Sequence, residues 1–96
     1  MVDLGAVVTA FARVIEQPAD GLALLEYTSR YGLTGTALWS RALLRKNTRC
    51  AVTDAYLAKG TWAWRPVGNM GYRAERISIE AMNALAAAGG EDGGNG

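Results

Sequence analysis

The period of the apolar residues is the feature that most limits what this chain can fold into, because the period changes after Gly60. Before Gly60 the apolar residues recur at intervals of three and four, which is the spacing of an amphipathic helix. Pro18 lies just after the first of these segments and cannot continue its helix, and Gly32 follows the second. The pattern therefore predicts four helices, at residues 2–16, 21–31, 35–45 and 49–59.

Beyond the fourth segment the apolar residues alternate with polar ones, which is the two-residue period of a strand. Residues 61–67 and 72–79 are the two alternating runs, and the segment 68–71 between them is typical of a turn. The two runs therefore predict a β-hairpin. A last, alanine-rich helix is expected at 80–88, and the glycine-rich acidic tail at 89–96 is expected to be disordered.

These elements predict a mainly α fold with a small β-hairpin, in the order helix, helix, helix, helix, hairpin, helix. This is the element order of a winged helix-turn-helix. Residues 1–88 are expected to form a single winged-helix domain, because the chain is too short for two. The helix at 2–16 is apolar on most sides, so we expect it to be buried either within the monomer or against a second copy, as a dimerisation element.

The charge of the chain is unevenly distributed along the sequence. The net charge is only +1, yet residues 30–76 hold nine of the ten Lys and Arg residues and only two of the nine acidic residues. A basic middle section between acidic ends indicates a polyanionic partner. An ordinary solvated surface would leave the same pattern, so the charge by itself keeps both interpretations open.

Several short runs in the second half share their order and spacing with one known family. These are Leu33-Thr34 before Leu38, the 26 positions from Thr34 to Gly60, Trp64-Arg65-Pro66 before Gly68-Asn69, the run 73–79, and the segment from Glu80 to Leu85. On these residues, 33–85 resembles the winged helix of the multiple-antibiotic-resistance regulator (MarR) family of transcription factors. The length of the chain suits a compact relative of that family, such as a phage or mobile-element regulator.

The resemblance implies a recognition helix at about 48–59 in the major groove of DNA and a wing at 62–79 on the backbone or in the minor groove. It implies that the DNA-binding residues are Arg45, Lys46, Asn47, Thr48, Arg49, Thr53, Arg65, Asn69, Arg73 and Arg76. Among them, Thr48 has the alternative of being only a helix cap.

The hairpin residues also have structural alternatives. Arg65 and Arg73 could pair with Glu75 across the hairpin rather than contact DNA. Trp62 and Trp64 are better explained as core or interface residues than as a platform on which bases stack. These alternatives stay open from the sequence.

The composition argues against catalysis. The chain has no histidine, which removes the commonest general base and metal ligand. Its single cysteine, Cys50, has no histidine to activate it and is expected to be a small buried apolar residue. No enzyme activity, no cofactor and no metal site are therefore expected.

No apolar run approaches the roughly 18 residues that a membrane-spanning helix needs, and the chain starts without a basic leader. We therefore expect a cytoplasmic protein of a bacterium or a phage-infected bacterial cell, without a membrane partner.

Two functions remain as hypotheses. The first is a DNA-binding transcriptional regulator that binds double-stranded DNA as a homodimer. The second is a small, phage-type winged-helix module that binds a host protein rather than DNA. The second is kept because Arg49 stands where the MarR family has an aliphatic residue in its recognition helix.

Overall fold

The computed structural model describes residues 9–68, 71 and 73–95, and for residues 89–95 it describes the backbone alone. Within these residues the chain forms seven strands and one helix. They are β1 (Phe11–Ala19), β2 (Leu22–Thr28), β3 (Thr34–Leu43), β4 (Thr48–Arg49), β5 (Tyr56–Leu57), β6 (Trp62–Pro66), β7 (Ile77–Ser78) and α1 (Ile79–Asn95).

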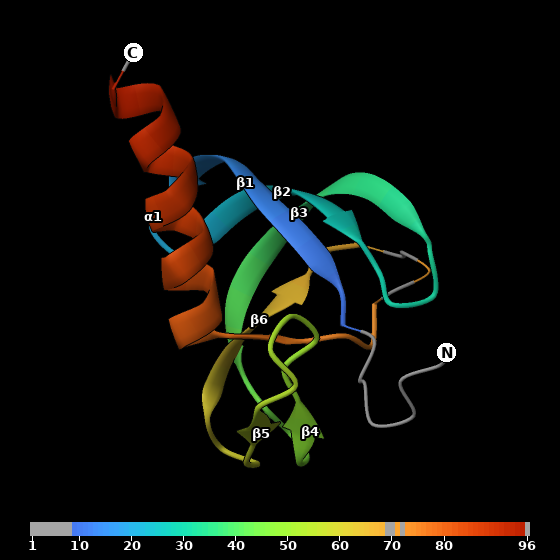
Figure 1. The fold of residues 1–96 in the computed structure, drawn as a ribbon. Coiled ribbons are helices and arrows are strands. Elements are labelled where there is room, and N and C mark those ends of the chain that lie inside the picture. The colour runs from blue at the N-terminus through green and yellow to red at the C-terminus, as the bar shows by residue number, and fades with distance from the viewer. Residues whose placement is uncertain (1–8, 69–70, 72, 96) are drawn as a thin grey trace.

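Five of the strands form one antiparallel sheet in the order β1-β2-β3-β6-β7. The sheet curls into half of a barrel, and β4 and β5 form a separate hairpin at one end of it (Figure 1). The helix α1 packs against β1, β6 and β7. Because β1 and β7 are the two edges of the sheet, α1 covers the side on which the sheet alone does not close.

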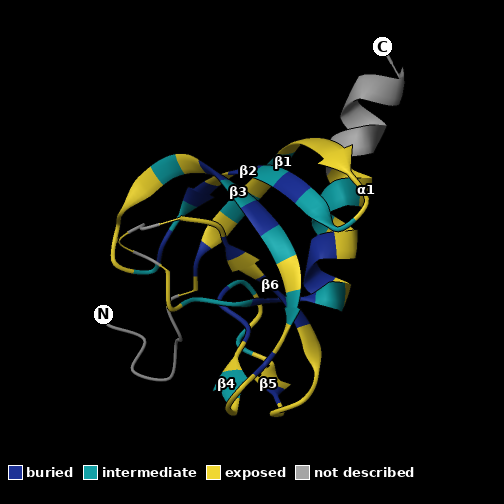
Figure 2. Cartoon of the chain, turned by 180° about the vertical axis from the view of Figure 1, so that it is seen from behind, coloured by how far each residue is buried: buried dark blue, intermediate teal, exposed yellow. Residues whose placement is uncertain are grey.

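The core lies inside the curl of the sheet. Its largest fully buried side chains come from β2, β3, β7 and α1: Trp39, Tyr27, Leu25, Ile77 and Met82. The rings of Tyr27 and Trp39 pack with their centroids 4.9 Å apart and their planes tilted by 52°. Buried residues alternate with more exposed ones along β2 and β3 (Figure 2). This is the expected pattern for a sheet that turns one face to the core.

A short backbone segment after β4 joins the two edges of the sheet. The amide of Ala10 donates a hydrogen bond of 2.8 Å to the carbonyl of Ala51, and the amide of Ala51 donates one of 2.8 Å to the carbonyl of Arg76. Ala10 precedes β1 and Arg76 precedes β7, so both edges are held to one residue at this end of the half-barrel. Ala51 itself is buried, and water does not compete for these bonds.

The predicted helices of the first two thirds of the chain are wrong. β2 (Leu22–Thr28) lies in the segment expected to be a helix at 21–31, and β3 (Thr34–Leu43) takes up most of the segment expected to be a helix at 35–45. In place of a helix at 49–59 the chain forms a turn between β4 and β5. The predicted helix at 2–16 lies partly outside the described residues, and from Phe11 onward the chain is in β1.

The physical reason is that these segments satisfy two periods at once. In β2 the leucines can be placed at helical spacing, but Ala23, Leu25 and Tyr27 also alternate, and these three are the residues that are buried. A short apolar run cannot distinguish a helix from a strand by its period. The decision comes from the neighbours, because Leu25 is paired with Val14 on one side and with Ala37 on the other.

The wing predicted at 62–79 is also wrong, although a strand is present where 61–67 was expected to form one. β6 pairs with β7 through Ala63↔Ser78 and Trp64↔Ile77. Its other edge pairs with β3 over five residue pairs. A wing has to project as a free hairpin, whereas β6 is an inner strand of the sheet. The chain is therefore not a winged helix-turn-helix of the MarR type. The prediction of a regulator built on that fold is wrong.

The C-terminal part is helical over a longer stretch than expected. α1 runs from Ile79 to Asn95 and so includes the helix predicted at 80–88. Ala81 and Met82 on its first turn are buried against the sheet. The expectations that residues 1–88 form one domain and that 89–96 is disordered stay predictions.

The fold predicts very different costs for two leucine truncations. Leu25 is fully buried, so Leu25→Ala should lower the free energy of unfolding by about 2–5 kcal/mol. Leu43 is 52% exposed, so Leu43→Ala should lower it by about 1 kcal/mol or less. Urea denaturation followed by circular dichroism measures both. Equal losses in the two variants would contradict the assignment of the core face of β2 and β3.

Candidate functional site

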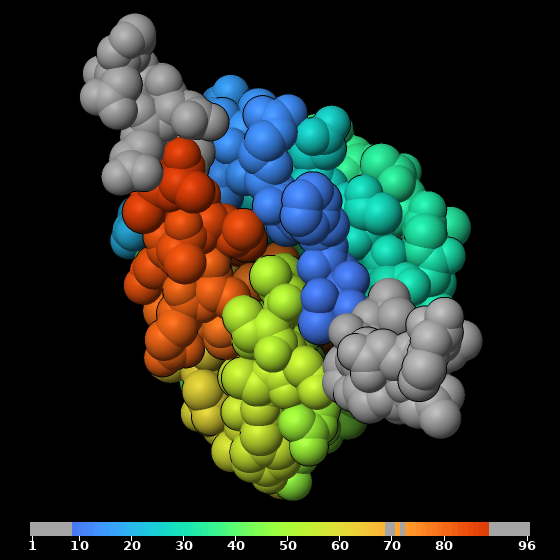
Figure 3. Space-filling view, in the orientation of Figure 1, coloured from blue at the N-terminus to red at the C-terminus, as the bar shows by residue number. Residues whose placement is uncertain are grey.

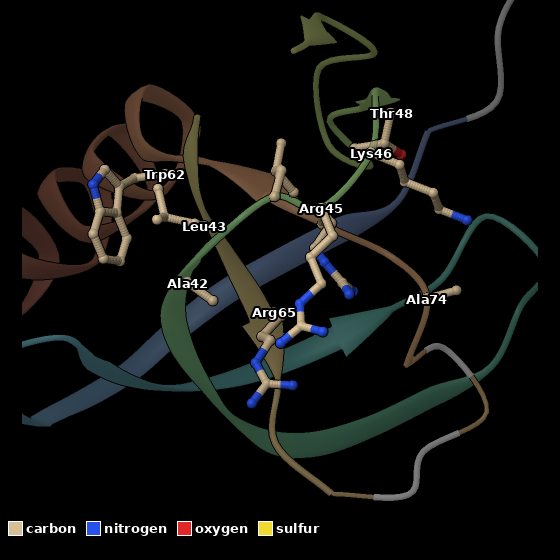
Figure 4. Close-up of a pocket in the computed structure, with 10 residues that line it drawn as sticks. Ala42, Leu43, Arg45, Lys46, Thr48, Trp62, Arg65 and Ala74 are labelled. Atoms are coloured by element: carbon tan, nitrogen blue, oxygen red, sulfur yellow. The ribbon is translucent and has the colours of Figure 1, made fainter. Parts of the chain in front are cut away.

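Beside the β4–β5 hairpin the surface holds a cavity of about 750 Å³ that is lined by positive side chains (Figure 4). Four of its lining residues are cationic: Arg45, Lys46, Arg65 and Arg76. None of the described residues that line it is acidic. The cations come from the segment after β3, from β6 and from the residue before β7, so the fold brings together groups that are far apart in the sequence.

Backbone hydrogen bonds fix the segment that carries Arg45 and Lys46. The amide of Leu44 donates to the carbonyl of Thr61 at 2.9 Å, and the amide of Gly60 donates to the carbonyl of Leu44 at 2.9 Å. The Asn47 side chain accepts a hydrogen bond of 2.8 Å from the amide of Lys59. The two ends of the β4–β5 insertion are thereby clamped together, which sets the position of the cations at its base.

Arg76 is held in place by two hydrogen bonds, and its pKa is lowered. Its Nη1 donates hydrogen bonds to the carbonyls of Arg73 at 2.8 Å and Glu75 at 2.9 Å. Burial, and after it the positive charge of Arg65, hold the pKa of Arg76 below its ordinary value. The guanidinium stays protonated at neutral pH. Two like charges therefore face the same cavity in the folded protein.

The described residues include three ion pairs, and none of them uses a cation of this cavity. They are Arg13–Glu26, Arg41–Asp20 and Arg49–Asp54. The nearest acid in the sequence, Glu75, accepts a hydrogen bond from the hydroxyl of Tyr27 instead. The alternative in which Arg65 pairs with Glu75 is therefore not what the structure shows, and no ion pair among the described residues neutralises a cation of this cavity.

A second cavity, of about 420 Å³, adjoins the first and shares Thr48 with it. It is lined by Arg30, Asn47, Thr48, Arg49 and Tyr56. The Nε atom of Arg30 is buried and has no hydrogen-bond partner within the part of the chain that is described. We refer to the two cavities together as the basic groove. In the space-filling view the β4–β5 hairpin, which carries Thr48, Arg49 and Tyr56, forms the lower end of the molecule (Figure 3).

Local turns position the cations of the second cavity. The Ser29 hydroxyl accepts hydrogen bonds from the amides of Tyr31 and Leu33, which closes the turn that carries Arg30. Arg49 donates a hydrogen bond of 3.0 Å to the carbonyl of Asp54. Asp54 has a φ of 65°, a conformation that aspartate tolerates better than most residues. Its carboxylate lies 3.9 Å from Arg49, which reduces the positive charge there.

The structure brings together seven of the ten residues that the sequence analysis assigned to DNA. Five of them line the first cavity: Arg45, Lys46, Thr48, Arg65 and Arg76. Asn47, Thr48 and Arg49 line the second. Thr53 lies in the turn between β4 and β5, where its hydroxyl accepts from the amide of Ala55. Arg73 lines neither cavity, and Asn69 lies outside the described residues.

Three charged or aromatic residues of the groove were not among the predicted DNA-binding residues. Arg30 and Tyr56 fall within the segments predicted as helices at 21–31 and 49–59, and Trp62 was better explained as a core or interface residue. The signal for Arg30 was present in the basic middle section, to which it belongs. No pattern in the sequence indicated that Tyr56 and Trp62 would lie beside arginines, because that depends on strand pairing.

The single cysteine is not an exposed nucleophile. Cys50 is 1% exposed, and its Sγ accepts a hydrogen bond from the amide of Ser78 at 3.4 Å. Burial raises the pKa of the Cys50 thiol, but hydrogen bonds from Thr53 and Ser78 outweigh this effect and leave the pKa below its ordinary value. In the described part of the chain no group of three or more His, Cys, Asp and Glu residues is arranged to hold a metal ion.

Comparison with known proteins adds nothing to this picture: no family model, no curated protein and no solved structure matches the chain. Among the described residues, no helix has the length and apolar character needed to cross a membrane. The expected compartment stays a prediction.

The Tyr27–Glu75 contact predicts a specific loss of stability in alkali. Burial, and then the hydrogen bond to Glu75, raise the pKa of Tyr27 far above its ordinary value of about 10. Above that pH the unfolded chain loses the tyrosine proton while the folded protein keeps it, so the free energy of unfolding falls as the pH rises. Denaturant titrations at a series of pH values should show a steep fall that Tyr27→Phe makes shallower.

Tyr31→Phe is the matched control, because Tyr31 is exposed. It should leave the slope of stability against pH unchanged. A Tyr27→Phe slope equal to that of the unmodified protein would show that Tyr27 is not buried in its protonated form.

Proposed function

We propose that the protein binds the phosphate backbone of a nucleic acid through the basic groove. The observation that carries this proposal is the convergence of Arg45, Lys46, Arg65 and Arg76 on one cavity that no described carboxylate lines. Guanidinium and ammonium groups are the side chains that bind phosphate oxygens most strongly, arginine through paired N–H groups and lysine as a point charge.

The arrangement of charge favours a ligand over a role in folding. Cations that stabilise a fold are normally paired with acids, as Arg13 is with Glu26 and Arg41 with Asp20. Arg65 and Arg76 instead face the same cavity, and the pKa of Arg76 is lowered by burial first and by the positive charge of Arg65 second. Like charges at close range destabilise the protein when it is free. A bound polyanion would relieve that repulsion, so the cluster is better explained by binding.

The extent of the groove favours a polymer over a single small anion. The second cavity continues from the first at Thr48 and adds Arg30 and Arg49. A chain of phosphates can contact both cavities at once, whereas one phosphate would use only one of them. Binding of this kind depends mainly on the release of counterions from the backbone, so it is strongly dependent on salt and largely independent of sequence.

This proposal differs in mechanism from the regulator expected from the sequence. A recognition helix at 48–59 would have read base edges in the major groove, but β4, a turn and β5 occupy that segment. The proposed contacts are to phosphates, and they come from loops and strands. The expected homodimer stays a prediction. A protein with an acidic surface, the second hypothesis from the sequence, is distinguished by the test below.

The proposal predicts a measurable salt dependence. Fluorescence anisotropy of labelled random-sequence oligonucleotides, single-stranded and duplex, should show binding at micromolar protein in low salt. If the four cations of the first cavity each neutralise one phosphate, log K should fall with log salt with a slope of about −3. The double variant Arg45→Ala with Arg65→Ala should weaken binding and make the slope shallower by about 1.5.

Arg13→Ala is the control for loss of an arginine, since it removes one positive charge from an exposed ion pair on β1 and β2 outside both cavities. Loss of that pair costs little stability. The absence of binding to either oligonucleotide in low salt would refute the proposal. Binding to polyglutamate as tight as to nucleic acid would replace it with an acidic protein partner.

A further inference from the structure

Trp62 is more exposed than the other two tryptophans and is not a core residue. Trp39 is fully buried and Trp64 nearly so, but Trp62 is 54% exposed at the start of β6. It is paired across the sheet with Leu43, which is also exposed. A large exposed aromatic ring keeps apolar surface in contact with water, and such a patch commonly marks a binding site.

Trp62 belongs to the same cavity as the cations. Figure 4 shows Trp62 and Leu43 together at one end of the first cavity, Lys46 and Thr48 toward the other end, and Arg45 and Arg65 between them. The indole lies at the edge of the first cavity, beside the path that we propose for the backbone, and it also lines a further cavity with Arg41 and Ile79. It extends that path with an apolar surface that a phosphate cannot use.

A second exposed aromatic occupies the other cavity. Tyr56 is 60% exposed and lines the second cavity with Arg30 and Arg49. The basic groove thus has an exposed aromatic side chain in each of its two cavities, with the six arginines and lysines of the groove distributed between and around them. Surfaces that bind both the bases and the backbone of a nucleic acid combine aromatic side chains with cations in this way.

We propose that the ligand of the basic groove is a single-stranded nucleic acid whose bases stack on Trp62 and Tyr56 while its phosphates contact the arginines. This inference rests on the proposed function and narrows its ligand. In a duplex the faces of the bases are covered by their neighbours, so an exposed indole has little to stack on. In a single strand each base presents a free face, and every base has one, which makes stacking tolerant of sequence.

The backbone holds Trp62 ready for this contact. Thr61, its neighbour, accepts a hydrogen bond from the amide of Leu44, and Leu44 is the residue before Arg45. The indole and the first cation of the loop are therefore positioned relative to one another by the strand pairing and by this bond. A ligand does not need to order a flexible loop before it binds, and such preorganisation reduces the entropy that binding loses.

The test measures the affinities of the unmodified protein and of Trp62→Ala for three ligands of about 12 nucleotides, a length within the range of small single-strand sites. The ligands are oligothymidylate, oligouridylate and a DNA duplex. Trp62→Ala should weaken binding of the single strands by about tenfold, the effect of losing one stacked base, and leave the duplex unchanged. The DNA and RNA arms distinguish the two sources of a single strand.

Two further measurements separate stacking from a loss of structure. Trp62→Phe, which keeps a smaller ring, should bind single strands with intermediate affinity. Since Trp62 is the exposed tryptophan, single strands should also quench the intrinsic fluorescence of the unmodified protein more than that of Trp62→Phe. Tyr31→Ala is the control, because Tyr31 is equally aromatic, more exposed than Trp62 and outside both cavities.

The outcomes distinguish this inference from the proposed function. Salt-dependent binding in which the duplex is bound as tightly as the single strands, or in which Trp62→Ala weakens all ligands equally, would overturn the inference and leave backbone binding intact. Failure of all three ligands to bind in low salt would overturn both.

Discussion

The two hydrogen bonds of Ala51 are the interaction on which the rest of the structure depends. They connect Ala10 at the start of β1 to Arg76 at the start of β7, and so hold the edges of the curled sheet together. An open sheet of five strands would leave both edges free to pair with other chains. With this link at one end and α1 across β1 and β7, the sheet becomes a half-barrel with one enclosed core.

The same link determines where the charge lies. The carbonyl of Arg76 accepts a hydrogen bond from the amide of Ala51. This bond fixes the backbone of Arg76 beside the β4–β5 hairpin. The neighbouring Glu75 accepts a hydrogen bond from Tyr27, and among the described residues it forms no ion pair with Arg65 or Arg76. A buried polar contact in the core and a charged groove on the surface are thus two consequences of one backbone arrangement. This is why residues that are 31 positions apart in the sequence, as Arg45 and Arg76 are, can line one cavity.

The sequence predicted most of the charged residues of the groove but not how the fold arranges them. The basic middle section was visible in the sequence, and most of the residues assigned to DNA do lie together. They lie together although the argument that grouped them relied on a helix and a wing that are absent, and their role in binding stays a prediction. Short segments such as the loop after β3 keep their neighbours in any fold, which is why Arg45 to Arg49 stayed together. Arg30 belongs to the basic middle section, but Tyr56 and Trp62 joined the groove through pairing between distant segments, which no local pattern indicated.

The sequence by itself determined where the chain turns and where its charge is concentrated. The glycines at 21, 32 and 60, where the periodic segments were divided, all adopt positive φ values that other residues rarely reach. Nine of the ten cations follow residue 29 whatever the fold. Only the tertiary structure decided that the segments between those glycines are strands. Their apolar residues fit both periods, and a strand gains its hydrogen bonds from a partner elsewhere in the chain rather than from its own sequence. The choice between helix and strand, and with it the position of every groove residue, was therefore made by pairing.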